Sequence, residues 1–440
     1  MMRPDGYSTE SQLMLKKLSA IAAAGALGFA MWLWVQRIAI PHQQQLAIAQ
    51  SIPRGNLSDL YPRWLGAREL LLHGRDPYGS DLTREIQAGY YGRPLDSSRP
   101  NDPKDQQAFA YPIYVVFLLA PTVRLPFPLV QRILLGFFVV LTACSVPLWF
   151  RALDWRVSRS TSVVWILLTL GSFPAIQGFK LQQLSLLVAG LIAASFSLLA
   201  AGFPLLAGIF MAFASIKPQL VALPAACLCL WVLGNWRQRQ RFFWGFGLAM
   251  LALIGGGEIL LPGWVSEFRR SSAEYWRYTG GGRSVLDVEL SPLWGRLVAA
   301  ALIMFLFASC WRWRKAQVHT PDFNWVLGLI MATTLMVIPM FAPYNQLLLI
   351  PALMVIALAA RTIWNAGRIP RWLLILTGGF IVWPWLSAAA LVLALMFLPD
   401  TEVRRAWVWP LATNFAIPTL PLGLLLIGKK WHRRTERIEP

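Results

Sequence analysis

The run LVQRILLGFFVVLTACSVPLWF, residues 129–150, carries a single charged side chain, Arg132. A membrane-spanning helix needs about 20 predominantly apolar residues, and this run has that length. Similar runs recur along the chain, and several are short, as expected for helices that border a water-filled cavity. The sequence therefore predicts an all-α polytopic membrane protein with about twelve transmembrane helices. The candidate spans are residues 19–40, 129–150, 161–176, 183–200, 204–216, 219–234, 241–262, 293–311, 324–342, 347–360, 372–398 and 407–427.

The composition agrees with a membrane protein. Of the 440 residues, 56% are hydrophobic and 14% are charged, and the mean hydropathy is +0.51. Soluble proteins carry about 25% charged residues, so a soluble enzyme and a disordered chain are both excluded. The net charge of +19 comes from short basic clusters between apolar runs. Such clusters are typical of cytoplasmic loops, and nucleic acid is not expected as a partner. The clusters are Lys16-Lys17, Arg237/Arg239/Arg241, Arg312/Arg314/Lys315 and Lys429/Lys430/Arg433/Arg434.

The proline-rich apolar stretch 111–125 decides the topology. If it crosses the membrane, the basic loop 151–159 lies outside, against the positive-inside rule. If it dips back or lies within the protein on the outer side, every basic cluster and both termini face the cytoplasm, and we adopt this alternative. The chain then divides into a cytoplasmic N-terminus (1–18), a first transmembrane helix (19–40), an outer loop with amphipathic helices and a short apolar dip (41–128), a transmembrane bundle (129–428) and a basic cytoplasmic tail (429–440).

The outer loop contains a predicted helix. Residues 60–73, LYPRWLGARELLLH, mix apolar and charged positions at helical spacing. Leu60, Trp64, Ala67, Leu70 and Leu71 share one face, and a helix of this kind lies along a membrane surface. An enzyme that acts on lipid-borne substrates requires such a helix, whereas a plain connecting loop does not.

The same loop carries two acidic positions of interest. Asp59 precedes the predicted helix, where an acidic residue is an ordinary cap and also a candidate catalytic group. Asp76-Pro77-Tyr78 follows Gly74 and reads as the stop and turn that end the helix.

Two lysines lie next to apolar spans. Lys180 lies in the segment QGFKLQQ, residues 177–183, and Lys217-Pro218 separates two short apolar runs. An ionisable group at membrane depth is costly and usually faces a cavity, where an ammonium group can hold a phosphate. The alternative is a lysine that reaches to the lipid headgroups, which remains open for Lys217 and is favoured for Lys180.

The other polar groups of the outer face are few. Glu258 is the main carboxylate near an outer span end, and Tyr344-Asn345-Gln346 is the polar interruption between two apolar spans. A further outer loop contains Arg277, Arg283, Asp287 and Glu289.

Metal binding is not predicted. Cys144, Cys227, Cys229 and Cys310 all lie within apolar runs without metal-ligand spacing, which is typical of small core residues. The four histidines are scattered, and no HExxH motif occurs.

Several of these stretches together resemble one family, glycosyltransferase family 87. The resemblance covers about residues 56–235, with a weaker later block at Tyr344 and residues 347–351. Gln182 and Ser185 stand where that family usually has glycine and asparagine. The similar stretches are Asp59, Gly66-Ala67-Arg68, Leu70–Leu72, Gly74 and Asp76-Pro77-Tyr78; then Tyr111-Pro112, residues 118–121 and 125–127; then residues 182–187; then Ala207-Gly208 and Ile216-Lys217-Pro218.

The resemblance implies a GT-C fold and a polyprenyl-phosphate-sugar donor, with mannose the sugar for several members. It also implies an acidic catalytic base in the first outer loop, a role that falls on Asp59. Lys217, Arg283 and Lys180 are then candidates for contact with the donor phosphate. Gln183, Glu258, Asp76, Tyr78, Tyr344 and Asn345 complete the candidate cavity residues.

The implied enzyme is an inverting mannosyltransferase of the inner membrane with its active site on the periplasmic or exterior face. Its partners would be membrane lipids, the lipid-linked donor and a lipid-linked or glycan acceptor, without a metal or other cofactor. The main rival is a transporter or flippase of a lipid-linked sugar, which also has about twelve spans and a polar cavity. Transporters often show paired repeats with broken helices, and we find no such pairing.

Overall fold

A computed structural model describes residues 5–53, 58–96 and 98–435, and all regular structure in these ranges is helical. The elements are α1 (Asp5–Trp34), η1 (Val35–Ala39), α2 (Ile40–Ala49), α3 (Tyr61–His73), α4 (Ser80–Tyr91), α5 (Val115–Leu119), η2 (Ala120–Thr122), α6 (Phe127–Ala152), α7 (Arg159–Leu170), α8 (Phe173–Leu181), α9 (Ser185–Ala200), α10 (Pro204–Ala214), α11 (Pro218–Leu233), α12 (Trp236–Leu260), α13 (Trp264–Tyr278), α14 (Val285–Leu290), α15 (Pro292–Arg312), α16 (Pro321–Val337), η3 (Pro343–Leu349), α17 (Ile350–Leu358), α18 (Ala360–Asn365), α19 (Arg368–Ala394), α20 (Asp400–Arg405), η4 (Trp409–Leu411) and α21 (Ala416–Thr435).

The predicted spans coincide with helices, but many of those helices are short. Within the described ranges, six helices are long and apolar enough to cross a membrane. The pair α7 and α8, bent by 55°, makes a seventh if it is one span. Each remaining predicted run falls on one of five apolar helices of 10–17 residues. The chain is thus an all-helical polytopic membrane protein, and the figure of twelve crossings stays a prediction.

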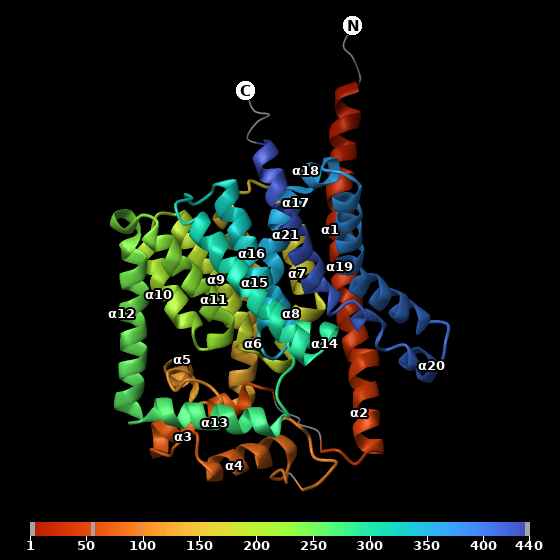
Figure 1. Cartoon of the computed structure of the whole chain (residues 1–440). Helices are drawn as coiled ribbons and strands as arrows, with labels where there is room; N and C mark the ends of the chain where they lie inside the picture. The colour runs from red at the N-terminus through yellow and green to blue at the C-terminus, as the bar shows by residue number, and fades with distance from the viewer. Residues whose placement is uncertain (1–4, 54–57, 97, 436–440) are drawn as a thin grey trace.

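The helices separate the molecule into two ends (Figure 1). α1 begins and α21 ends at the same end of the bundle, where both termini lie. The opposite end carries α3, α4, α5 and α13, and we call it the loop end. The first long loop and the 264–278 helix, which are far apart in sequence, therefore share one end of the molecule.

The stretch 111–125 lies at the loop end and forms no long helix. α5 has five residues and η2 has three, well below the about 20 residues that a bilayer requires. Most of its apolar side chains are instead buried in protein: Val115 and Val116 are fully buried, whereas Phe117 and Leu118 are exposed. α5 packs on α3.

α3 confirms the predicted helix at 60–73. Leu60, Trp64, Ala67 and Leu70 are buried on one face, and Gly74 ends the helix with φ of 65°. Gly66 faces the ring of Phe109 so closely that a Cβ would lie 2.9 Å from Cε2. These contacts fix α3 against the other elements of the loop end.

α10 and α12 pack tightly through glycines. A Cβ at Gly245 would overlap the carbonyl oxygen of Leu205 and lie 3.0 Å from its carbon, whereas a Cβ at Gly247 would have no neighbour within 4 Å. Because backbone atoms cannot give way as a flexible side chain does, the close approach of the two helices requires glycine at position 245.

Gly245→Val is expected to destabilise the protein by about 1–3 kcal/mol through overpacking. Gly247→Val is the matched control, because it makes the same change on the same helix without a clash. Thermal unfolding in detergent, followed by tryptophan fluorescence, measures the difference. Equal midpoints for the two variants would show that the α10–α12 contact does not limit stability.

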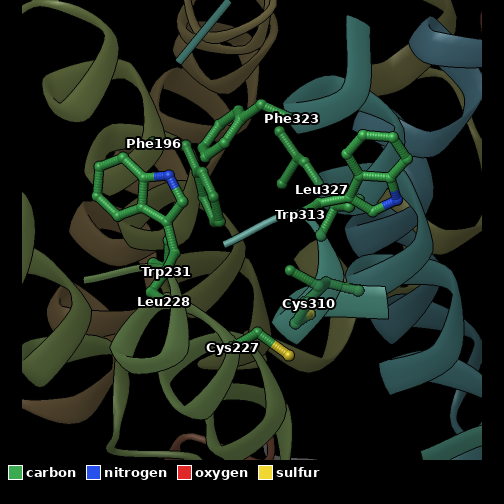
Figure 2. A pocket seen from close by; sticks show the side chains of 10 residues that line it. Phe196, Cys227, Leu228, Trp231, Cys310, Trp313, Phe323 and Leu327 are labelled. Carbon is green, nitrogen blue, oxygen red and sulfur yellow. The ribbon is translucent and has the colours of Figure 1, made fainter. Parts of the chain in front are cut away.

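A small apolar cavity lies between α9, α11, α15 and α16 (Figure 2). Its volume is about 20 Å³, and its walls include Phe196, Trp231 and Phe323. Cys227 and Cys310 line it and are buried. These two cysteines are packing residues of the bundle, as predicted, whereas Cys144 is exposed on the outside of α6.

Candidate functional site

Asp59 is held beside the bundle and is not a helix cap. Its backbone N–H donates to the carbonyl oxygen of Leu181 at 3.0 Å. α3 has no side-chain cap, since Leu60 occupies the cap position. The Asp59 carboxylate turns instead toward the bundle, where Oδ2 accepts a hydrogen bond from the Gln183 amide. Oδ1 accepts a long one, 3.4 Å, from the hydroxyl of Tyr90 on α4.

Gln183 lies in the tight turn between α8 and α9. The turn is made by Gln182, whose φ of 51° and ψ of 48° place it in the left-handed region. Glycine adopts this conformation at the least steric cost. Gln182 is held there by a hydrogen bond from Ser58, at 2.5 Å, and by its own bond to the Gln131 carbonyl, at 2.5 Å.

Lys217 lies in the turn between α10 and α11. It adopts the extended conformation that precedes a proline, with φ of −120° and ψ of 84°. Its side chain is 7% exposed, and Nζ donates to Gln183 Oε1 at 2.8 Å and Ser185 Oγ at 2.7 Å. Lys217 is therefore directed into the protein and does not reach to the headgroups. In the described part of the chain it has no salt bridge.

Aromatic rings surround the Lys217 ammonium group. Nζ lies 5.2 Å from the ring centre of Tyr344 and 5.7 Å from that of Tyr111. Asn345, next to Tyr344, accepts a hydrogen bond of 2.8 Å from Ser185 Oγ. Two residues of the predicted polar interruption, Tyr344 and Asn345, are thus part of the same cluster as Lys217.

A second cation, Arg63, also lies beside Asp59. Its guanidinium stacks 4.6 Å from the ring centre of Tyr111, and Nη1 donates to the Asp59 carbonyl oxygen at 2.7 Å. Asp105 completes this side and accepts a hydrogen bond of 3.2 Å from Tyr275 on α13. The site therefore joins the first loop, three turns of the bundle and α13.

The electrostatics suit a carboxylate base. Burial raises the pKa of Asp59 above its ordinary value, opposed by the charge of Arg63. Asp105 raises this pKa further, and the Gln183 hydrogen bond and the Lys217 charge lower it. A raised pKa makes Asp59 a stronger base than an exposed aspartate, while the two cations favour its charged form.

The neighbouring tyrosines stay neutral. Burial is the main cause that raises the pKa of both Tyr90 and Tyr275, and the nearby Asp59 and Asp105 carboxylates add to it. Both hydroxyls are therefore hydrogen-bond donors to the carboxylates, and neither is available as an anionic base.

Asp76 and Tyr78 support the site from outside. Asp76 Oδ1 accepts from the Tyr78 backbone N–H at 2.9 Å, closing the predicted turn. The Tyr78 hydroxyl then donates to the Tyr111 carbonyl oxygen at 2.7 Å. Both residues thus position Tyr111, whose ring is approached by Arg63 and by Lys217.

Three predicted site residues lie outside this cluster. Glu258 is exposed and accepts from the Gly263 N–H at 2.7 Å at the end of α12. Arg283 is exposed, and its carbonyl oxygen accepts from Phe341 N–H at 3.1 Å. Lys180 is exposed at the end of α8. It lines two neighbouring grooves of about 520 and 510 Å³.

The sequence did not point to Arg63, Tyr90, Asp105 or Tyr275. Arg63 follows Asp59 by four residues, and residues four apart share a helix face. This spacing indicates that the two side chains lie close together. Asp105 and the tyrosines stand in no motif, and their approach to Asp59 is visible only in the fold. Within the described ranges, no group of three or more His, Cys, Asp or Glu side chains could hold a metal ion.

One protein family matches the chain. The sequence model of glycosyltransferase family 87 matches residues 109–343, more than half of the 440 residues. Tyr111, Gln183, Lys217 and Tyr275 lie within the matched stretch, and Asp59 lies before it. No curated protein and no solved structure matches the chain.

Proposed function

The chain belongs to glycosyltransferase family 87, and from this premise we propose that it transfers mannose from a polyprenyl-phosphate donor to a lipid-linked or glycan acceptor. That the protein is a membrane glycosyltransferase follows from the family and the apolar helices. The donor, the sugar and the residue roles are our proposal. The observation that carries this proposal is that one amide group, that of Gln183, contacts both residues: its nitrogen contacts Asp59 and its oxygen contacts Lys217.

Asp59 is the general base of the proposed reaction. It takes the proton of an acceptor hydroxyl while the acceptor oxygen attacks the anomeric carbon. The bond from that carbon to the phosphate oxygen breaks, and polyprenyl phosphate leaves with the electron pair. Because attack and departure occur on opposite faces, the anomeric configuration inverts. General-base assistance of this kind is worth about 10²- to 10⁴-fold in rate.

Lys217 stabilises the leaving phosphate. Negative charge grows on the phosphate as the bond breaks, so a fixed cation nearby favours the transition state over the ground state. Nζ uses two of its three donors on Gln183 and Ser185, and the third remains for a phosphate oxygen. Arg63, whose guanidinium also contacts Tyr111, is a second cation for the same charge. We assign Lys180 and Arg283 to the approach of the donor.

The two grooves beside α8 suit a lipid-borne donor. The 510 Å³ groove has Trp32 on α1, Leu135 on α6 and Phe179 on α8 in its walls. Gln182 and Lys180 line its polar part. A groove with an apolar wall and a cationic mouth fits a prenyl chain and its phosphate.

The basic clusters support an active site on the outer face. Arg239, near the start of α12, donates to the Arg314 carbonyl oxygen at 2.6 Å. This contact joins two basic clusters near the end of the bundle that carries the termini. By the positive-inside rule that end faces the cytoplasm, and the loop end with Asp59 faces the periplasm or exterior.

Transfer by the purified protein in nanodiscs tests the function. Polyprenyl-phosphate-mannose is offered with a panel of lipid and glycan acceptors, with and without a chelator. We expect an inverted mannoside to form and transfer to persist in chelator, because a monophosphate leaving group needs no bridging metal. Activity that vanishes with chelator and returns with manganese would contradict the scheme. Movement of the labelled donor across the bilayer without transfer would instead favour the flippase.

A further inference from the structure

We propose that Gln183 is a positioning residue that directs one oxygen of Asp59, Oδ1, to the acceptor hydroxyl and holds the other, Oδ2, against the Lys217 side of the site. This inference rests on the proposed role of Asp59 as the base. It specifies that Oδ1 of Asp59 takes the proton and that the hydrogen bond from Gln183 determines this.

The orientation of the Gln183 amide is dictated by its neighbours. Lysine has three donors and no acceptor, so the atom that faces Lys217 Nζ at 2.8 Å must be the amide oxygen. The NH₂ group then faces Asp59, where it donates to Oδ2. Flipping the amide would set two donors against each other at Lys217 and two acceptors at Asp59.

The two oxygens of Asp59 therefore differ. Oδ2 is occupied by a close hydrogen bond from Gln183. Among the residues that the structure describes, Oδ1 accepts a hydrogen bond only from Tyr90, at 3.4 Å, near the limit of a hydrogen bond. A hydroxyl that approaches the carboxylate finds Oδ1 available, and the proton goes there.

Gln183 is rigidly held. Its side chain is buried, with 5% of the residue exposed, and its backbone N–H donates to the Gly178 carbonyl at 3.0 Å. Both amide atoms are hydrogen-bonded, the nitrogen to Asp59 and the oxygen to Lys217. Rotation of the amide would therefore break both hydrogen bonds together. Removing the amide leaves the carboxylate without its close donor and Lys217 without one acceptor.

Loss of the Gln183 donor also makes Asp59 easier to protonate. A hydrogen bond to the charged form favours that form, so its removal raises the pKa of Asp59 further above its ordinary value. A base with a higher pKa becomes protonated at a higher pH. When the pH is lowered, activity therefore begins to fall at a higher pH than in the wild type. The other charged or titratable groups that act on Asp59 are unchanged: Arg63, Tyr90, Tyr91, Asp105, Lys217, Tyr275 and Tyr344.

Two substitutions at Gln183 test this role. Gln183→Leu removes both hydrogen bonds, and Gln183→Glu keeps the shape and the bond to Lys217 but faces Asp59 with an acceptor. We expect kcat to fall about tenfold or more in both. We also expect the acid limb of the kcat profile to move to higher pH, by about one unit in Gln183→Glu because like charges then meet.

Gln346→Leu is the matched control. Gln346 is equally buried, at 5% exposed, and its amide donates to Asn414 at 2.8 Å, so it makes no contact with Asp59. We expect the control to leave the acid limb in place. An acid limb unmoved in both Gln183 variants, whatever their kcat, would show that Gln183 acts only in packing.

A measurement without substrate separates this proposal from the proposed function. Infrared titration of the carboxylate band, as a difference between each protein and its Asp59→Asn counterpart, reports the protonation of Asp59 itself. We expect its midpoint to be higher in Gln183→Leu and Gln183→Glu than in the wild type. Equal midpoints would overturn the positioning role, whereas absent transfer with shifted midpoints would overturn the donor or acceptor proposed above.

Discussion

Asp59→Asn is expected to lower kcat by about 10²- to 10⁴-fold, the usual contribution of a general base. Asparagine has the shape of aspartate, and its amide oxygen can still accept the hydrogen bond from Gln183. The substitution therefore removes the basic oxygen and leaves the packing in place. Single-turnover transfer in nanodiscs, with donor in excess, measures the loss in the chemical step.

Asp105→Asn is the matched control for Asp59. Asp105 lies in the same cluster, but it is hydrogen-bonded to Tyr275 at 3.2 Å and to Gln107 at 2.7 Å. We expect a change of less than about tenfold, together with a lower pKa of Asp59, because Asp105 raises it. Equal rates for Asp59→Asn and the wild type would remove Asp59 from the chemistry and leave the family assignment intact.

Lys217→Met is expected to lower kcat by about 10²- to 10³-fold. Removal of one fixed group that stabilises developing negative charge has an effect of this size. Methionine fills a similar volume, so the loss comes from the charge and the two hydrogen bonds to Gln183 and Ser185. The measurement is kcat and KM for the polyprenyl-phosphate donor at saturating acceptor.

Whether Lys217→Met changes kcat or KM shows at which stage of the reaction Lys217 acts. A lower kcat means that the ammonium acts mainly in the transition state, whereas a higher KM alone means equal binding of ground and transition states. The second result would contradict the proposed role. Lys315→Met is the control, because Lys315 is exposed in the turn after α15 and the substitution makes the same chemical change outside the site.

Most of the helices were predictable because length and apolar content are local properties. Each candidate span coincides with a helix, from the long α6 to the short α10 and α11. The number of crossings was not predictable, because helices of 10–17 residues depend on burial in the bundle and not on length. The stretch 111–125 shows the same effect, since most of its apolar residues are covered by protein.

The candidate site was predictable as a set of residues but not as a contact network. Asp59 and Gln183 are 124 positions apart, and Lys217 and Gln183 are 34 apart. A single sequence indicates that each is unusual in its segment, but it does not place them side by side. Arg63 and Tyr275 were missed because a charged or aromatic residue in an outer segment also fits an ordinary water-facing surface.

The order of the site residues along the chain has a consequence for biogenesis. α10 and α11 are helices of 11 and 16 residues with Lys217 in the turn between them. A lysine in the middle of an inserting segment costs about 2.5–3.5 kcal/mol at the translocon. Gln183 and Ser185, which accept its hydrogen bonds, precede it in the chain and leave the ribosome first. The two side chains that accept hydrogen bonds from Lys217 are therefore synthesised before Lys217 itself. The hairpin of α10 and α11 can enter the membrane beside Gln183 and Ser185, which are already there.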